Sequence, residues 1–123
     1  MLAVNISEAI GAGNLPRLKQ VLKDMNCSLN SFISPFGNLL HICASFGSVE
    51  LFREIISESG LSVNSQTDQG STPLHVAARQ NRADIVEFLM DFDDIDDTIR
   101  DLEGRTPLEC CKSRQVKNII ECK

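Results

Sequence analysis

The amino-acid sequence predicts an all-α solenoid of about four helix-turn-helix repeats. The prediction rests on an internal repeat with a fixed period and on the apolar positions that keep this period. Segment 70–90, GSTPLHVAARQNRADIVEFLM, aligns with segment 36–56, FGNLLHICASFGSVELFREII, so that His75 falls on His41 at a spacing of 34 residues (75 − 41). Apolar residues meet apolar residues along the aligned segments. Such a period is the signature of stacked repeats, each burying its apolar face against its neighbours.

The same period extends toward both ends of the chain. The tripeptide Thr-Pro-Leu at 72–74 recurs at 106–108, and Gly13 lies one period before Gly47. Four copies therefore fit into a single domain, with limits at roughly 1–33, 34–66, 67–100 and 101–123. The first copy lacks the Thr-Pro opening and the last is short, as terminal units of a stacked array usually are.

The first repeat is expected to place its second helix after Pro16. Proline is tolerated in the first turn of a helix. Leu18, Val21 and Leu22 follow at helical spacing, one period before apolar residues of the second repeat. They are expected to form the buried face of this helix.

Thr72 and Pro73 mark the start of an inner helix over TPLHVAAR. The threonine hydroxyl can accept a hydrogen bond from a free amide, and proline at the first helical position lacks an amide that would stay unpaired. Ala77 is small because neighbouring repeats approach closely. Cys43 and Cys111 occupy the same slot in the second and fourth repeats, so both are interpreted as alanine substitutes.

A turn and an outer helix follow each inner helix. Gly47 ends the inner helix of the second repeat, and Asn81 replaces it in the third, since both residues tolerate a left-handed backbone. The outer helix of the third repeat is predicted over Ala83 to Met90, with Asp84 and Glu87 facing solvent. Its buried face is expected to consist of four apolar residues, Ile85, Val86, Leu89 and Met90.

Composition narrows the function classes. The formal net charge of −5 and the lack of a basic cluster argue against nucleic-acid binding and against anionic membranes, and favour a basic patch on another protein. The five cysteines are odd in number and lack CxxC spacing, which fits neither a disulfide framework nor a zinc knuckle. With no signal-peptide pattern or long apolar run, the sequence favours a cytoplasmic or nuclear location.

Three groups of residues could suggest chemistry, and each has a structural interpretation that is preferred. The run 91–97 carries five carboxylates but lacks the glycine and glutamate of an EF-hand loop, so it is interpreted as a solvated turn, with an acidic patch for a basic partner as the alternative. Cys110 and Cys111 have no neighbouring histidine and are assigned to packing. His41 and His75 are assigned to structure as well. We expect no catalytic residue, no metal and no cofactor.

The segment GSTPLHVAA at 70–78 matches the G-x-T-P-L-H-x-A-A core of ankyrin repeats, and GRTPLECC at 104–111 is a degraded copy. Over nearly all of its length the chain resembles the ankyrin-repeat family. The resemblance implies short β-hairpin loops between repeats and histidines that bond the backbone of the neighbouring repeat. Segment 70–90, with DIDDTIRD at 94–101, also resembles the amino-terminal ankyrin segments of fungal oxysterol-binding proteins.

The resemblance implies a non-catalytic adaptor or targeting module, monomeric and belonging to a larger protein, that binds another protein or peptide on its concave face. The alternative is a stand-alone inhibitor of an enzyme such as a protein kinase. The concave face consists of hairpin tips and exposed inner-helix ends. By position these are Ser34, Pro35, Gly37, Ser45, Phe46, Asp68, Gln69, Ser71, Arg79, Gln80, Leu102, Glu103, Arg105, Ser113 and Arg114.

Within this set Phe46 is either an aromatic anchor for the partner or a shield over the first repeat. Arg79, Arg105 and Arg114 are expected to line one stripe, which would suit an acidic peptide despite the negative net charge. The concave residues of the first repeat cannot be assigned from the sequence.

Overall fold

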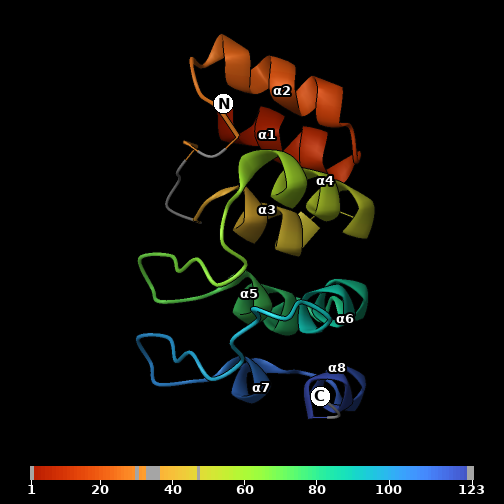
Figure 1. Cartoon of the computed structure of the whole chain (residues 1–123), viewed down its shortest axis with the longest axis vertical. Coiled ribbons are helices and arrows are strands. Elements are labelled where there is room, and N and C mark those ends of the chain that lie inside the picture. Colours follow the sequence, from red (N-terminus) through yellow and green to blue (C-terminus); the bar gives the residue numbers. More distant parts are fainter. Residues whose placement is uncertain (1, 30, 33–36, 47, 122–123) are drawn as a thin grey trace.

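The computed structural model describes residues 2–29, 31–32, 37–46 and 48–121. Within these residues eight helices form four consecutive pairs, which stack along the long axis of the molecule, with the loops projecting from one edge (Figure 1). The all-helical prediction is confirmed. The helices are α1 (Leu2–Gly11), α2 (Leu15–Asp24), α3 (Leu39–Phe46), α4 (Val49–Ser59), α5 (Pro73–Arg79), α6 (Ala83–Met90), α7 (Pro107–Cys110) and α8 (Arg114–Glu121).

Several helices begin at a side-chain cap. The hydroxyl of Thr72 accepts a hydrogen bond from the amide of His75 at 3.3 Å, and Pro73 follows in the first turn of α5, as predicted. Such a cap satisfies one of the free amides at the helix start and contributes about 0.5–2 kcal/mol. The other capping residues include Asn14 for α2, Ser48 for α4, Thr106 for α7 and Ser113 for α8.

The outer helix α6 has the predicted bounds and the predicted buried face. Ile85, Val86 and Leu89 are fully buried, and Met90 is 4% exposed. The turn before it carries Asn81 with a φ of 57°, which confirms the left-handed conformation. Gly47, for which the same conformation was predicted, lies outside the described residues.

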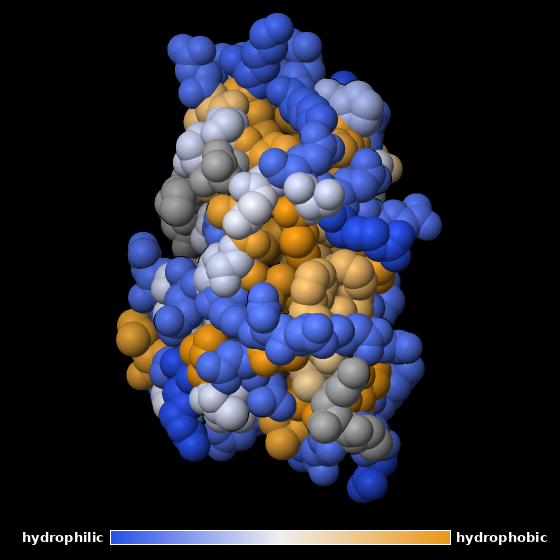
Figure 2. Space-filling model, in the orientation of Figure 1, coloured by the Kyte–Doolittle hydropathy of each residue, from blue (hydrophilic) through white to orange (hydrophobic). Residues whose placement is uncertain are grey.

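Small residues allow the inner helices to stack closely. Ala44, Ala77 and Ala78 have no exposed surface, and Cys43 is equally buried, which confirms its interpretation as a core residue. One continuous apolar core runs through the four helix pairs. In the orientation of Figure 1, hydrophilic side chains cover most of the surface, and hydrophobic ones show in the middle of the face (Figure 2).

The fourth repeat departs from the 34-residue period. Helix α7 has a single turn and ends at Cys110, so Cys111 lies in extended backbone and is only half-buried. The prediction that Cys111 fills the alanine slot is therefore wrong. Helix α8 begins early: Val116 takes the place of Ile85, a separation of 31 residues (116 − 85).

The loops before α5 and α7 are tight turns closed by one backbone pair. The amide of Thr67 donates to the carbonyl of Ser71 at 2.8 Å, and the amide of Asp101 donates to the carbonyl of Arg105 at 2.9 Å. These hairpin-shaped turns contain no assigned β-strand in the described residues. None of the helices described is both long enough and apolar enough to cross a bilayer.

Candidate functional site

The two histidines tie each repeat to the following loop. The Nδ1 atom of His75 accepts the amide of Thr72 at 3.1 Å, so Nε2 carries the proton and donates to the carbonyl of Arg105 at 2.9 Å. The Nε2 atom of His41 lies 2.9 Å from the carbonyl of Ser65. Burial is the largest influence on both imidazoles, and it lowers the pKa of each. The structural assignment of both histidines is confirmed.

Asp101 organises the hairpin of the fourth repeat, although the sequence analysis did not single it out. Its side chain is 2% exposed. One carboxylate oxygen accepts the amides of Glu103 and Arg105 at 2.9 and 3.0 Å, and the other accepts the guanidinium of Arg79 at 2.7 Å. These bonds, the one from the Arg105 amide foremost, lower the pKa of the Asp101 carboxyl despite its burial.

A sequence signal for this role existed. Thr67 lies 34 residues before Asp101 (101 − 67), and its hydroxyl accepts the amides of Gln69 and Ser71 in the same manner. The pattern is a residue with an acceptor side chain, three positions before a glycine and five before Thr-Pro. It can be recognised only by comparing the two repeats.

The predicted stripe of arginines does not form. The guanidinium of Arg79 donates hydrogen bonds to the hydroxyl of Ser71 at 2.8 Å and to the carboxylate of Asp101. Arg105 pairs with Glu103 at 2.6 Å. Arg114 belongs to the first turn of α8 rather than to the end of an inner helix. An acidic ligand along these three side chains therefore has no support in the structure.

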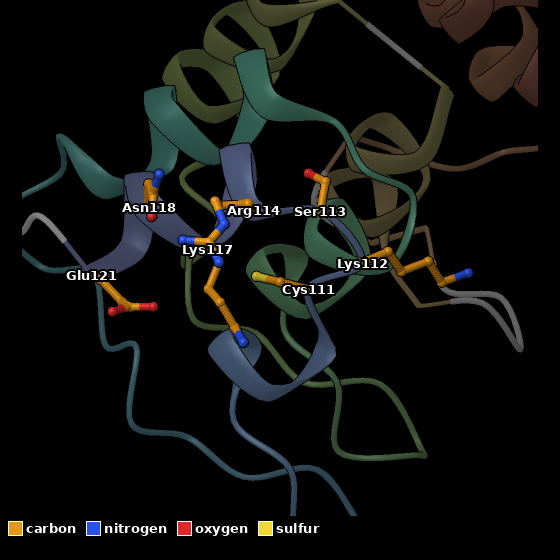
Figure 3. A pocket seen from close by; sticks show the side chains of 7 residues that line it. All are labelled: Cys111, Lys112, Ser113, Arg114, Lys117, Asn118 and Glu121. Atoms are coloured by element: carbon orange, nitrogen blue, oxygen red, sulfur yellow. The ribbon is translucent and has the colours of Figure 1, made fainter.

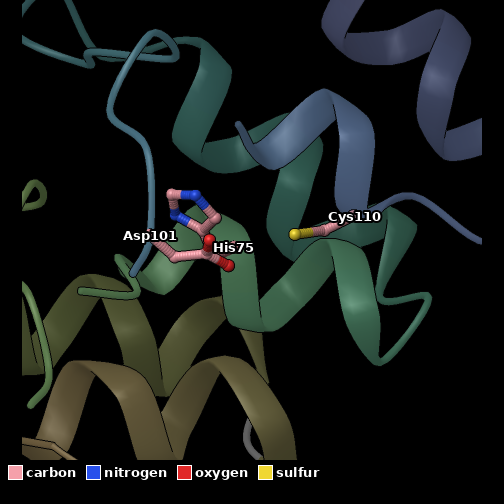
Figure 4. Close-up of side chains that lie close together, drawn as sticks. All are labelled: His75, Asp101 and Cys110. Atoms are coloured by element: carbon pink, nitrogen blue, oxygen red, sulfur yellow. The ribbon is translucent and has the colours of Figure 1, made fainter. Parts of the chain in front are cut away.

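Three side chains with ligand atoms meet where α5 faces α7. Possible ligand atoms of His75, Asp101 and Cys110 lie within 4.8 Å of one another. Figure 4 shows these three side chains. Both ring nitrogens of His75 and both oxygens of Asp101 already form hydrogen bonds, and one guanidinium contacts the carboxylate directly. A cation would have to displace these bonds, so the cluster is a hydrogen-bonded network between repeats.

Three cysteines of the described residues, Cys43, Cys110 and Cys111, give no sign of an activated thiol. Burial raises the pKa of Cys43 to about 12, and burial also raises the pKa values of Cys110 and Cys111. The thiolate is the nucleophilic form of cysteine, and these environments disfavour it at neutral pH.

The acidic run 91–97 is an outer turn, as predicted. Asn64 of the preceding repeat holds it: the side-chain amide donates to the carbonyl of Asp94 at 2.8 Å, and the Asn64 side-chain oxygen accepts the amide of Asp96 at 3.0 Å. The carboxylate of Asp96 accepts bonds from the side chain and amide of Thr98, which lower its pKa. These contacts shape the turn.

Two hairpin tips are fixed relative to each other. The amide of Leu102 donates to the carbonyl of Gln69 at 2.9 Å. Gly70 makes this approach possible: its φ is +78°, and a Cβ atom there would lie 3.1 Å from the Cα atom of Asp101. The side chain of Leu102 is consequently held in solvent, with 73% of its surface exposed.

The end of the inner helix α3 carries the second exposed apolar side chain. Phe46 is 56% exposed, and among the described residues Phe46 and Leu102 are the large hydrophobic side chains that are exposed. This exposure favours the anchor interpretation of Phe46 over the shield. We name the exposed positions of the predicted set that lie in the hairpin tips and at the inner-helix ends the candidate surface, which consists of Phe46, Asp68, Gln69, Gln80, Leu102, Glu103 and Arg105.

Other members of the predicted set lie elsewhere. Ser71 is 2% exposed, Gly37 is buried, and Ser45 is half-buried, so these residues offer little side-chain surface to a partner. Ser34 and Pro35 lie outside the described residues. The placement of Ser113 and Arg114 at an inner-helix end is wrong, because both lie at the start of α8 (Figure 3).

The model of the ankyrin-repeat family, described as ankyrin repeats in three copies, matches residues 6–101 and 40–122. The chain belongs to this family. No curated protein sequence matches it.

Among solved structures, the chain is similar to the Saccharomyces cerevisiae Osh1 ANK – Nvj1 structure, with 26% identity and a TM-score of 0.81 over 98% of this chain and 53% of that one. The Osh1 ANK domain of Kluyveromyces lactis gives 26% identity and a TM-score of 0.79 over 98% and 49% of the two chains. The ankyrin domain of Bcl-3, 20% identical with a TM-score of 0.74, covering 94% of this chain and 50% of its own, shares the fold.

The chain thus spans about half the length of these structures. The Osh1 matches confirm the resemblance to the ankyrin segments of fungal oxysterol-binding proteins.

Proposed function

We propose that this chain is a non-catalytic adaptor or targeting domain that binds a segment of a partner protein across the candidate surface. The observation that carries the proposal is the exposure of Phe46 and Leu102, whereas most other large apolar side chains of the described residues lie in or against the core. Exposed aromatic side chains often supply much of the binding energy when a partner covers them.

The relatives support the class of partner. Ankyrin repeats are typically protein-binding, and the Osh1 ankyrin domain was crystallised with Nvj1. By analogy this domain would direct a larger protein to the site of its partner, in the cytoplasm or nucleus, as a monomer. The raised pKa values of the Cys43 and Cys110 thiols, and the hydrogen bonds that occupy both ring nitrogens of His75, are consistent with a chain that performs no catalysis.

The proposal is tested by affinity capture from an extract of the source cells. Phe46→Ala removes the aromatic ring from an exposed position, so the fold should persist while partner binding falls at least tenfold. Glu87→Ala, an exposed change on the outer helix α6, serves as the matched control and should bind like the wild type. Circular dichroism checks that all three proteins are folded.

Full retention of the partner by Phe46→Ala, with loss in Glu87→Ala, would move the binding site to the outer helices. If the captured partner is an enzyme whose activity falls on binding, the inhibitor alternative replaces targeting.

A further inference from the structure

The carboxyl-terminal end of the stack carries an open hollow that the proposed function does not use. Its volume is about 420 Å³, and Lys112, Ser113, Arg114, Lys117, Asn118 and Glu121 contribute to its lining. Figure 3 shows Arg114 and Lys117 on α8, and Lys112 on the segment before it with its side chain pointing away from them. A volume of this size lies within the range of ordinary ligand sites and would admit one or two side chains of a partner.

The hollow is polar where an internal repeat would be apolar. In the register that places Val116 on Ile85, Lys117 takes the position of Val86 and Glu121 that of Met90. Val86 and Met90 are buried in α6, whereas Lys117 and Glu121 are exposed in α8. A partner for this end must therefore satisfy charges rather than cover apolar surface.

The cations of the hollow differ from most arginines nearby in their ion pairing within the described residues. Lys112, Arg114 and Lys117 form no ion pair with any residue that the structure describes. By contrast, four arginines in the third and fourth repeats pair with carboxylates, namely Arg79, Arg82, Arg100 and Arg105. With Glu121 as the one acid of the lining, the hollow carries a formal charge of +2 (3 − 1), against −5 for the whole chain.

The start of α8 adds to this positive potential. Ser113 caps the helix through a bond from the amide of Val116 at 3.3 Å, and Arg114 follows in the first turn. Helix amino termini carry partial positive charge, which falls off within about one turn.

We propose that this hollow binds a carboxylate-rich segment of a partner protein, with Arg114 and Lys117 as the principal ligands of its carboxylates. Guanidinium groups pair with carboxylates through charge-assisted hydrogen bonds, and the side-chain amide of Asn118 can donate a further one. A short acidic segment fits better than a nucleic acid or an anionic membrane, because the net charge of −5 repels an extended polyanion while the local charge of +2 attracts a few carboxylates. No residue that lines this hollow belongs to the candidate surface.

The probe is a capped synthetic peptide with three glutamates alternating with glycine, titrated at low salt and followed by amide chemical shifts. Saturable shifts over residues 113–118 are expected, with the dissociation constant raised at least tenfold by Arg114→Gln/Lys117→Gln. A matched control, Lys23→Gln/Arg53→Gln, removes two cations without ion pairs elsewhere in the described chain and should bind like the wild type. Phe46→Ala should also leave this binding unchanged, which separates it from the proposed function.

Three results would overturn the proposal. The first is a response spread equally over Lys23, Arg53 and the hollow, and the second is a response that persists in Arg114→Gln/Lys117→Gln. The third is a titration in which inorganic phosphate shifts residues 113–118 and the peptide does not, since the hollow would then be a small-anion site. A glutamine version of the peptide should produce no shift.

Discussion

Asp101 shows how a single buried carboxylate can shape a surface without contacting a partner. Its carboxylate orients the backbone of the hairpin in the fourth repeat and binds Arg79 across the interface between the third and fourth repeats. Arg79, which the sequence suggested as a contact for the partner, therefore holds the loop of the fourth repeat in place instead. Its charge is satisfied within the molecule.

The variant Asp101→Asn tests this role. It keeps the shape of the side chain but removes the charge that faces Arg79 and Arg105, so we expect a loss of about 1–3 kcal/mol in the free energy of unfolding, measured by urea titration. Glu103→Gln is the matched control. Its carboxylate also pairs with Arg105 but is 73% exposed. Exposed pairs contribute about 0–1 kcal/mol. Equal effects of the two changes would contradict the buried role of Asp101.

At the scale of elements, the hairpin tips depend on close approach of backbones. Gly70→Ala forces a Cβ atom to within 3.1 Å of backbone atoms of the next loop, in addition to the strain of a positive φ. Gly60→Ala has a similar φ of +70° but meets no atom within 4 Å. The left-handed backbone alone costs about 1 kcal/mol. Thermal unfolding should therefore show a larger loss for Gly70→Ala than for Gly60→Ala, and the reverse order would contradict the packing of the tips.

Helix α6 was predictable because its sequence carries both signals needed. Residues 83–90 have apolar positions at helical spacing, and the preceding Asn81 marks the turn. The end of the fourth repeat was not predictable in the same way. No residue type in the sequence indicates that α7 ends after one turn. Because the 34-residue period was extended through this repeat, Ser113 and Arg114 were predicted at the wrong position.

The candidate surface was predicted by position rather than by exposure. Phe46 and Leu102 belong to it because the family pattern places tips and inner-helix ends there, and their exposure agrees. Ser71 fails because its side chain turns inward toward Arg79, a contact between residues of α5 and its own loop. Asp101 was missed because its partners lie on two elements that only the fold brings together.

At the scale of the whole molecule, the histidine network makes stability depend on pH. Burial lowers the pKa of His41 and His75 below the ordinary value of 6.5. Above that pH both are neutral in the folded and unfolded states. As the pH falls below 6.5, the unfolded chain takes up protons that the folded chain resists, so the free energy of unfolding decreases.

Urea titrations at pH 7.5, 6.5 and 5.5 should show a progressive decrease in the free energy of unfolding. The carboxyl groups of Asp101 and Glu109 have pKa values lowered below 3.8 and 4.5, respectively, and do not titrate in this window. In His75→Gln the decrease should be smaller, because one of the two responsible groups is gone. A stability that is flat or rises toward pH 5.5 would be inconsistent with neutral buried histidines.

The proposed function requires that a partner protein covers Phe46. The most direct measurement replaces Phe46 with a photo-crosslinking phenylalanine analogue, irradiates the domain in cell extract, and identifies the adduct by mass spectrometry. We expect one dominant adduct, which excess wild-type domain suppresses and excess Phe46→Ala domain does not. Crosslinking through the same analogue at position 87 of α6, with none at position 46, would contradict it.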